Sequence, residues 1–233
     1  MKQRLEPLLC ELHAHTTWSD GELSLTALVD LYGRNGFDVL CVTDHACRDG
    51  SHVSGDRFPA YLGAIAAEAN RARAIYDLLV VPGLELTWDD PDPARGAHVV
   101  AVGLETFVRL DSELDDVLRA ARDAGAALIA PHPYEHADGA HRRTTRLAAE
   151  WPRLGPLVDR AELFNRDELF AWVAQAGVAA VATRDFHRGE HLATWKTLLP
   201  CRRDARAVVE YLRSPLPAYL TRLEPARRDA LAA

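Results

Sequence analysis

A set of nine potential metal ligands lies at the ends of short apolar segments in this sequence. The nine residues are His13, His15, Asp20, His45, Glu85, His98, His132, Asp185 and His187. Imidazole nitrogen combined with carboxylate oxygen suits Zn, Mn or Fe better than Ca or Mg. At three or four ligands for each ion, with Glu85 bridging, the set predicts two or three divalent transition-metal ions with open positions for water and substrate.

The spacing within the motifs favours shared ions. In an extended segment residues i and i+2 point to the same side, so His13 and His15 can bind one ion together. Asp185 and His187 have the same spacing. In barrels of alternating strands and helices, the C-terminal strand ends and the loops after them build the active site. We therefore expect these separate stretches of sequence to direct their ligands to one rim.

Apolar strand-like segments alternate along the chain with amphipathic helical segments. Seven strands are expected, over residues 8–12, 39–43, 78–86, 98–104, 126–130, 161–164 and 178–183. Helical periodicity at i, i+3, i+4 and i+7 marks residues 25–32, 62–69, 114–121, 169–176 and 205–212. Such alternation is typical of a parallel sheet covered by helices. It predicts a closed or nearly closed α/β barrel, with an open doubly wound sheet as the alternative.

Each candidate ligand taken alone also has a purely structural explanation. A single histidine in a strand is more often a hydrogen-bonded core residue than a ligand. Glu85 could be the partner of a buried cation, and Asp20-Gly21 could be a simple turn. The whole set is harder to explain in this way, because desolvated polar groups at strand ends are costly unless they bind something.

In their order along the chain, these motifs resemble those of the PHP family, the polymerase and histidinol phosphatase domain. The resemblance covers residues 8–187, and the matching segments are His13-Ala14-His15-Thr16-Thr17-Trp18-Ser19-Asp20-Gly21, Thr43-Asp44-His45, Gly83-Leu84-Glu85, His98, Pro131-His132-Pro133 and Asp185-Phe186-His187. It implies a distorted seven-stranded (β/α)7 barrel with a trinuclear metal centre at the C-terminal ends of the strands. It also implies three ligand sets: His13, His15, Glu85 and Asp185; Glu85, His98 and His132; and Asp20, His45 and His187. Asp44 is expected to orient a ligand rather than to bind metal.

The chemistry expected of such a centre is phosphate-ester hydrolysis. A metal-bridging hydroxide would attack phosphorus in line, while the ions neutralise the phosphoryl oxygens and the leaving alkoxide. Arg184 stands where the family usually has a small residue, and its guanidinium could bind a phosphate or turn away into a salt bridge. The other candidate substrate-binding residues are Arg166, Tyr134, His136 and Trp18. For Trp18, packing at the rim is the alternative role.

The composition limits the partners of the protein. The chain has 233 residues, and 27 Lys and Arg against 34 Asp and Glu give a net charge of −7. This acidic balance disfavours binding along long nucleic acid, which depends on clustered basic residues. No apolar run approaches the ~20 residues needed to span a bilayer. With no signal segment before the first motif and no cysteine framework, we expect a cytoplasmic protein without a membrane partner.

We expect one PHP-like domain over residues 1–233, in which a helix and a strand within residues 203–223 complete the barrel and residues 225–233 fray. The leading function is metal-dependent hydrolysis of a small phosphorylated molecule, such as a nucleotide or a sugar phosphate. Two alternatives are a metallohydrolase of carboxyl or carbamate esters and a non-catalytic, metal-stabilised accessory domain. The oligomeric state stays open.

Overall fold

The computed structural model describes residues 6–137 and 144–224, so the expected fraying of residues 225–233 falls outside the described residues. All seven expected strands are present: β1 (Leu8–Glu11), β2 (Val39–Val42), β4 (Leu79–Trp88), β5 (Ala97–Val102), β6 (Ala127–Ala130), β7 (Arg160–Asn165) and β9 (Ala180–Thr183). β11 (Tyr219–Arg222) lies where the C-terminal strand was expected. Three further strands were not predicted: β3 (His45–Cys47), β8 (Glu168–Leu169) and β10 (Trp195–Leu199).

The main helices also lie where the periodicity places them. They are α1 (Leu25–Arg34), α2 (Phe58–Tyr76), α3 (Leu114–Asp123), α6 (Ala171–Gln175) and α7 (Ala205–Arg213). Shorter turns were not predicted: α4 (Arg146–Ala149), α5 (Trp151–Leu154), η1 (Gly155–Leu157) and η2 (Gly189–His191). Ser24 caps α1 by accepting a hydrogen bond from the Ala27 N–H at 3.2 Å, as an N-cap serine does. None of the helices in the described part of the chain combines the length and apolar composition that crossing a bilayer requires.

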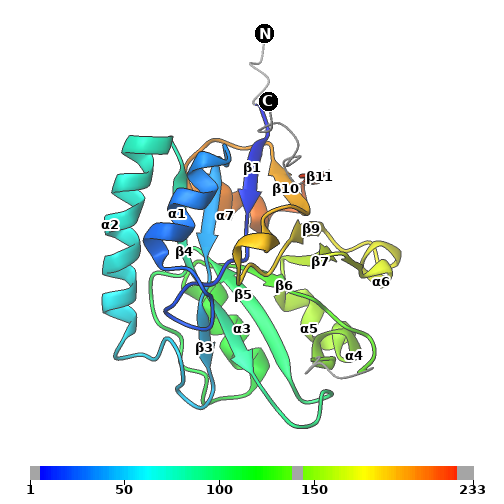
Figure 1. The fold of residues 1–233 in the computed structure, drawn as a ribbon. Coiled ribbons are helices and arrows are strands. Elements are labelled where there is room, and N and C mark those ends of the chain that lie inside the picture. The colour runs from blue at the N-terminus through cyan, green and yellow to red at the C-terminus, as the bar shows by residue number, and fades with distance from the viewer. Residues whose placement is uncertain (1–5, 138–143, 225–233) are drawn as a thin grey trace.

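The strands form one curled sheet that is mixed rather than parallel (Figure 1). Its order is β11-β10-β1-β2-β4-β5-β6-β7-β8, with β3 paired to β4 and β9 paired to β7. β4 and β5 pair antiparallel, as do β5 and β6, so the expected parallel sheet is wrong at its centre. For β4 and β5 the physical reason is the short turn through Pro91 and Pro93, because parallel neighbours need a crossover of a dozen or more residues. β6 runs in the direction of β4 again and is therefore antiparallel to β5.

The antiparallel direction of β5 decides where His98 lies. His98 is the second residue of β5 and pairs with Thr87, near the end of β4. An antiparallel strand brings its first residues to the edge at which its neighbours end. His98 therefore reaches the same rim as Glu85, although one stands at the start of a strand and the other toward the end.

Apolar side chains form two clusters on opposite faces of the sheet. In β2, Val39 and Cys41 belong to one cluster while Leu40 and Val42 belong to the other, as the two-residue period of a strand requires. One cluster includes the buried faces of α1, α2 and α3, and the other includes that of α7. Figure 1 shows α1 and α2 side by side along one flank of the sheet. Both faces of the sheet are thus covered by apolar side chains beneath its polar rim.

The segments that follow β1 and β9 meet beside the metal motifs. The Phe186 N–H donates to the His13 carbonyl at 3.1 Å, and the His15 N–H donates to the Phe186 carbonyl at 2.8 Å. Farther along, the Thr197 hydroxyl of β10 donates to the Ala182 carbonyl of β9 at 2.8 Å. The two backbone bonds of Phe186 bring the first and last ligand motifs together.

Candidate metal centre

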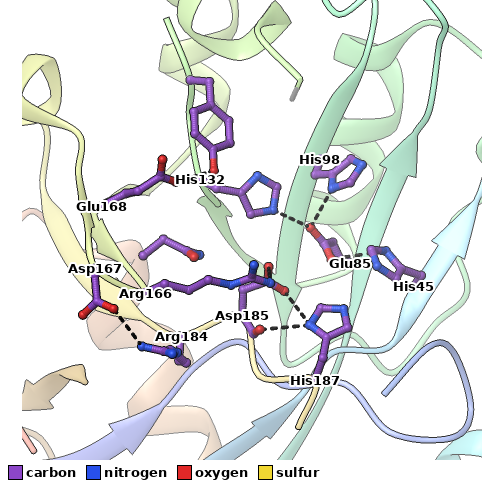
Figure 2. Close-up of a pocket in the computed structure, with 12 residues that line it drawn as sticks. His45, Glu85, His98, His132, Arg166, Asp167, Glu168, Arg184, Asp185 and His187 are labelled. Atoms are coloured by element: carbon purple, nitrogen blue, oxygen red, sulfur yellow. Dashed lines mark hydrogen bonds and ion pairs between the residues drawn. The ribbon is translucent and has the colours of Figure 1, made fainter. Parts of the chain in front are cut away.

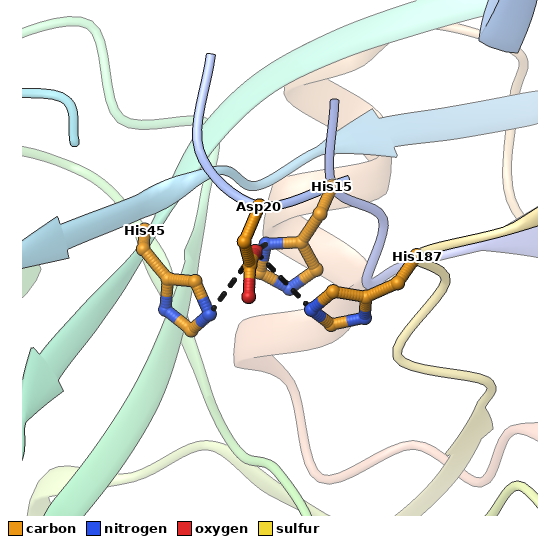
Figure 3. Close-up of side chains that lie close together, drawn as sticks. All are labelled: His15, Asp20, His45 and His187. Atoms are coloured by element: carbon orange, nitrogen blue, oxygen red, sulfur yellow. Dashed lines mark ion pairs between the residues drawn. The ribbon is translucent and has the colours of Figure 1, made fainter. Parts of the chain in front are cut away.

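The structure brings all nine candidate ligands together in three adjoining clusters, in each of which the ligand atoms lie within 4.8 Å of one another. The first cluster is His13, His15, Glu85 and Asp185; the second is Glu85, His98 and His132; the third is His15, Asp20, His45 and His187 (Figure 3). These sets are those expected to share ions, with His15 added to the third. Glu85 belongs to two clusters, so its two oxygens face different sets of imidazoles.

The first cluster has the spacing of ligands around one ion. The Nε2 atoms of His13 and His15 lie 3.0 Å apart, and Glu85 Oε2 lies 3.1 Å from the first and 3.2 Å from the second. Asp185 Oδ1 lies 3.5 Å and 3.3 Å from the same two nitrogens. Ligands of a tetrahedral transition-metal ion, at roughly 2.0–2.1 Å from it, lie roughly 3.3 Å from one another. The four side chains therefore fit a single small cation.

The second cluster contains two buried polar atoms that have no hydrogen-bond partner in the described part of the chain. Glu85 Oε1 lies 3.0 Å from His98 Nδ1 and 3.3 Å from His132 Nε2. Within the described residues, neither Glu85 Oε1 nor His98 Nδ1 makes a hydrogen bond. Buried polar atoms seldom lack a partner, and a cation between these two would satisfy both.

Histidines of the second and third clusters present defined nitrogens, because their other nitrogen is engaged. His187 Nδ1 lies 2.9 Å from the Asp185 carbonyl oxygen, which leaves Nε2 3.2 Å from Asp20 Oδ1. His98 Nε2 lies 3.3 Å from Asp89 Oδ1, which leaves Nδ1 for the cluster. Metal-binding histidines typically donate their other N–H to a carbonyl or a carboxylate, which fixes the tautomer. This arrangement is the one expected of ligands.

Glu162 was not predicted as a site residue, yet it supports two of the ligands from beneath. Its Oε1 lies 3.3 Å from His13 Nδ1 and accepts a hydrogen bond from the Thr183 hydroxyl. Its Oε2 accepts hydrogen bonds of 2.6 Å from the backbone N–H of His132 and from Asn165 Nδ2. Glu162 is fully buried. The sequence signal that could have revealed it is a carboxylate in the middle of an apolar strand.

The charged groups of the clusters shift one another's pKa values. Burial lowers the pKa of His15, but its hydrogen bonds with Asp185 and Glu85 outweigh burial and raise that pKa to about 9. Burial also lowers the pKa of His98, but the charge of Glu85 and the contact with Asp89 raise it to about 10. Burial raises the pKa of Glu85, yet the neighbouring imidazoles hold it well below its usual range. Protons on the histidines thus compensate the carboxylates, and a divalent cation could replace them.

Asp44 positions the loop that carries Asp20. Its carboxylate accepts hydrogen bonds from the Thr16 N–H at 2.7 Å, the Thr16 hydroxyl at 2.9 Å and the Ser19 hydroxyl at 2.6 Å. Gly21 closes this loop, and a Cβ there would lie 2.4 Å from the His15 carbonyl oxygen. Asp44 therefore acts through the loop and lies in none of the three clusters.

Three residues of the site have a left-handed backbone conformation although none is glycine. The φ angles are 29° at His132, 54° at Arg166 and 53° at Asp185. Such conformations cost on the order of 1–3 kcal/mol each and persist where the surrounding structure enforces them, typically at functional sites. The backbone at this rim is therefore held in unfavourable conformations that position the side chains of the site.

The clusters border a cavity of about 510 Å³ (Figure 2). The cavity is lined by His45, Glu85, His98, His132, Tyr134, Asn165, Arg166, Asp167, Glu168, Arg184, Asp185 and His187. Arg166, Arg184 and Tyr134 thus lie where substrate-binding residues were expected.

Two of the candidate substrate-binding residues lie elsewhere. His136 is exposed and outside the cavity lining. Trp18 is also outside the lining and packs edge-on against Tyr61, with ring centroids 5.5 Å apart. The structure gives Trp18 the packing role that was the alternative.

No family model matches the sequence, and a comparison with curated proteins finds no match. Solved structures do match. A two-domain protein from Bacteroides vulgatus that contains a predicted PHP-like metal-dependent phosphoesterase aligns with a TM-score of 0.70 and 19% identity, covering 94% of this chain and 66% of that one. The fold is PHP-like.

Two further structures with this fold have other names. A candidate metal-dependent phosphoesterase from Bifidobacterium adolescentis matches with a TM-score of 0.51 and 14% identity, over 77% of this chain and 88% of that one. An amidohydrolase from Chromobacterium violaceum, with bound sulfate and no metal, matches with a TM-score of 0.53 and 16% identity. The match covers 76% of this chain and 87% of that one. The chain spans just under two thirds of the Bacteroides protein. At these identities the likeness establishes the PHP-like fold.

Proposed function

We propose that the protein is a metal-dependent hydrolase that cleaves phosphate esters of a small phosphorylated molecule, such as a nucleotide or a sugar phosphate. The observation that carries this proposal is the convergence of nine ligands in three adjoining clusters, with six of the nine ligands lining a cavity that also holds two arginines. The neighbours named as phosphoesterases support the same class of reaction. The hydrogen bonds between the segments after β1 and β9 support a distorted seven-stranded (β/α)7 barrel as the architecture.

The donor set suits two or three ions of Zn, Mn or Fe, because it mixes imidazole with carboxylate. The expected ligand sets are His13, His15, Glu85 and Asp185; Glu85, His98 and His132; and Asp20, His45 and His187. When bound, such ions lower the pKa of a water molecule that they coordinate. Their positive charge also stabilises the phosphoryl oxygens.

Protein groups around the cavity have distinct parts in this chemistry. Arg166 donates from its terminal nitrogen to Asp185 Oδ2 at 2.9 Å and so holds that carboxylate in place. The Tyr134 hydroxyl donates to Glu168 Oε2 at 2.5 Å on the cavity wall. This hydroxyl–carboxylate pair lines the cavity, where it orients the substrate. His13 and His15 are fully buried, which keeps bulk water away from the first cluster.

The test is a panel of phosphomonoesters, phosphodiesters, carboxyl esters and carbamates, assayed with protein loaded separately with Zn, Mn or Fe. We expect phosphate esters to turn over with metal and to stop doing so after chelation. His132→Ala should abolish turnover while the fold survives, and the exposed His136→Ala is the matched control. Unchanged turnover in His132→Ala would remove the metal-site mechanism.

The same panel tests a second candidate function. The Chromobacterium neighbour is named an amidohydrolase, and an activated water attacks carbonyl carbon as well as phosphorus. Turnover of carboxyl or carbamate esters alone would replace the phosphoesterase proposal with this one. Stable metal binding without turnover of any ester would instead favour a non-catalytic accessory domain.

A further inference from the structure

The cavity has a wall that the metal-ligand clusters do not form. Figure 2 shows Arg184 and Asp167 together on the side away from His45 and His98. Arg184 directly precedes the ligand Asp185, yet Figure 2 shows its guanidinium directed away from that carboxylate. The cavity therefore offers a cationic group at a place distinct from the clusters.

The Arg184 guanidinium is poorly compensated for its degree of burial. Its side chain is only 13% exposed, and its Nε is buried without a hydrogen-bond partner among the described residues. In that part of the chain, the carboxylate within 4.0 Å of its nitrogens is that of Asp167, at 3.7 Å, which is too long for a hydrogen bond. The Asp167 side chain is itself 77% exposed. A buried charge without close partners is costly unless something binds it.

Arg166 differs from Arg184 in this respect. Its terminal nitrogen already donates to Asp185 Oδ2 at 2.9 Å, so Arg166 is committed to a ligand carboxylate. Arg184 retains donors for an incoming group, and a guanidinium offers them in a planar fork that matches a carboxylate or a phosphoryl group. Of the two cavity arginines, Arg184 is therefore the one suited to bind substrate directly.

We propose that Arg184 binds a second anionic group of the substrate, a carboxylate or another phosphoryl group, while the scissile phosphoryl group lies at the clusters. This inference rests on the proposed function and narrows its substrate class to molecules with two anionic groups. Asp167 competes with the second anion for the guanidinium, and its exposure lets it give way when the anion arrives.

The test measures binding of phosphonates that cannot be hydrolysed, by titration calorimetry on metal-loaded protein. Phosphonoacetate and phosphonopropionate carry a carboxylate, methylenediphosphonate carries a second phosphoryl group, and alkyl phosphonates of equal length carry neither. We expect one of the doubly anionic series to bind about tenfold more tightly than its matched alkyl phosphonate, the effect of one charge-assisted contact. Which series does so identifies the second group.

Two variants are expected to change the ligand preference in opposite directions. The preference is the affinity for the doubly anionic ligand divided by that for its matched alkyl phosphonate. Arg184→Gln should reduce this ratio to about one, whereas Asp167→Asn should increase it severalfold. Arg206→Gln, on the exposed face of α7, is the matched control and should leave the preference unchanged. Melting temperature and bound metal are measured for each variant.

Several results would overturn the proposal. These are no preference in the wild-type protein, equal weakening of both ligands in Arg184→Gln, or a reduced preference in Asp167→Asn. Equal weakening is also what a loss of metal would produce, so only the ratio of the two affinities counts as support. Because binding is read without turnover, the preference can be present or absent whether or not the esters of the panel are hydrolysed.

Discussion

The Thr87 hydroxyl fixes which nitrogen of His45 is available to the third cluster. Thr87 Oγ1 lies 2.7 Å from His45 Nδ1, and the same hydroxyl donates to the Glu85 carbonyl oxygen at 3.1 Å. Since the hydroxyl has only one proton to donate, His45 Nδ1 must be the donor in their contact. The lone pair of His45 then lies on Nε2, 3.7 Å from Asp20 Oδ1.

Replacing Thr87 by Val should therefore weaken ion binding at the third cluster. The isosteric side chain keeps the packing but removes the hydroxyl that accepts from His45 Nδ1, which leaves Glu85 Oε2, 3.2 Å away, as the remaining acceptor for that nitrogen among the described residues. Loss of such a supporting contact typically lowers metal affinity about 10- to 100-fold. Competition with a chelating dye measures the change. Thr87→Ser keeps the hydroxyl and should behave as wild type, and equal affinities in the Val and Ser variants would contradict the assignment.

Glu162→Gln should disturb the first two clusters at once. The amide would place N–H groups among four donors that now converge on a carboxylate, so the orientation of His13 and the backbone of His132 would both lose support. We expect metal affinity to fall about 10- to 100-fold, measured by elemental analysis after dialysis against a chelator. Glu190→Gln, at an exposed position, is the control, and full metal retention in Glu162→Gln would refute this role.

The buried ion pair between Lys196 and Glu11 predicts a strong effect on folding. Both side chains are fully buried, and Glu11 Oε2 also accepts a hydrogen bond from the Tyr32 hydroxyl at 3.1 Å. Lys196→Met would leave the carboxylate without its cation, which typically costs about 3–5 kcal/mol of unfolding free energy. Urea denaturation measures this loss, and Lys196→Met combined with Glu11→Gln should regain part of it. A single-variant loss below about 1 kcal/mol would show that the carboxylate finds another partner.

Metal loading should release protons. His15 and His98, with pKa values of about 9 and about 10, carry protons near neutral pH that must leave before their nitrogens bind a cation. Apparent affinity should therefore rise with pH through this range. Calorimetry in buffers of different ionisation enthalpy detects the release, and a binding heat that is independent of the buffer would contradict it.

The same shifts predict the pH dependence of stability in chelator-treated protein. Both histidines have folded-state pKa values above the ordinary 6.5, so their protonated forms stabilise the folded state. That contribution is complete below about pH 6.5 and is lost as the pH rises through about 9 to 10. The midpoint of urea denaturation should therefore fall as the pH rises across this window. A midpoint that rises with pH would contradict the prediction.

Much of this architecture could be predicted because each strand is a short apolar run with a polar residue at its end. The expected segment 39–43 contains all of β2, and the ligand His45 follows within two residues of the expected strand. Strand direction could not be predicted in this way, because the alternation of apolar strand segments with amphipathic helical segments is the same whichever way a strand runs in the sheet. His98, at the start of its strand, was the one ligand whose position carried information about direction.

Side-chain placement near the rim was less predictable than the ligands themselves. Trp18 stands between two ligands in the sequence, but its large apolar surface packs against Tyr61 instead of facing the cavity. The role of Glu162 could not be predicted, because one carboxylate in a strand has no spacing pattern. Its importance arises from four hydrogen-bond donors that come from distant segments. Such convergence exists only in three dimensions.

The bridge between Ala14 and Phe186 also sets an order of events during synthesis. The ribosome delivers the N-terminal residues first, so Glu85, His98 and His132 can meet while β9 has yet to be made. His13 and His15 must wait for the segment that carries Asp185 and closes over them. All ligands of the second cluster are therefore synthesised before β9, whereas the other two clusters lack a ligand until the segment after β9 has been made, so a ribosome stalled before β9 would present a chain with two incomplete clusters.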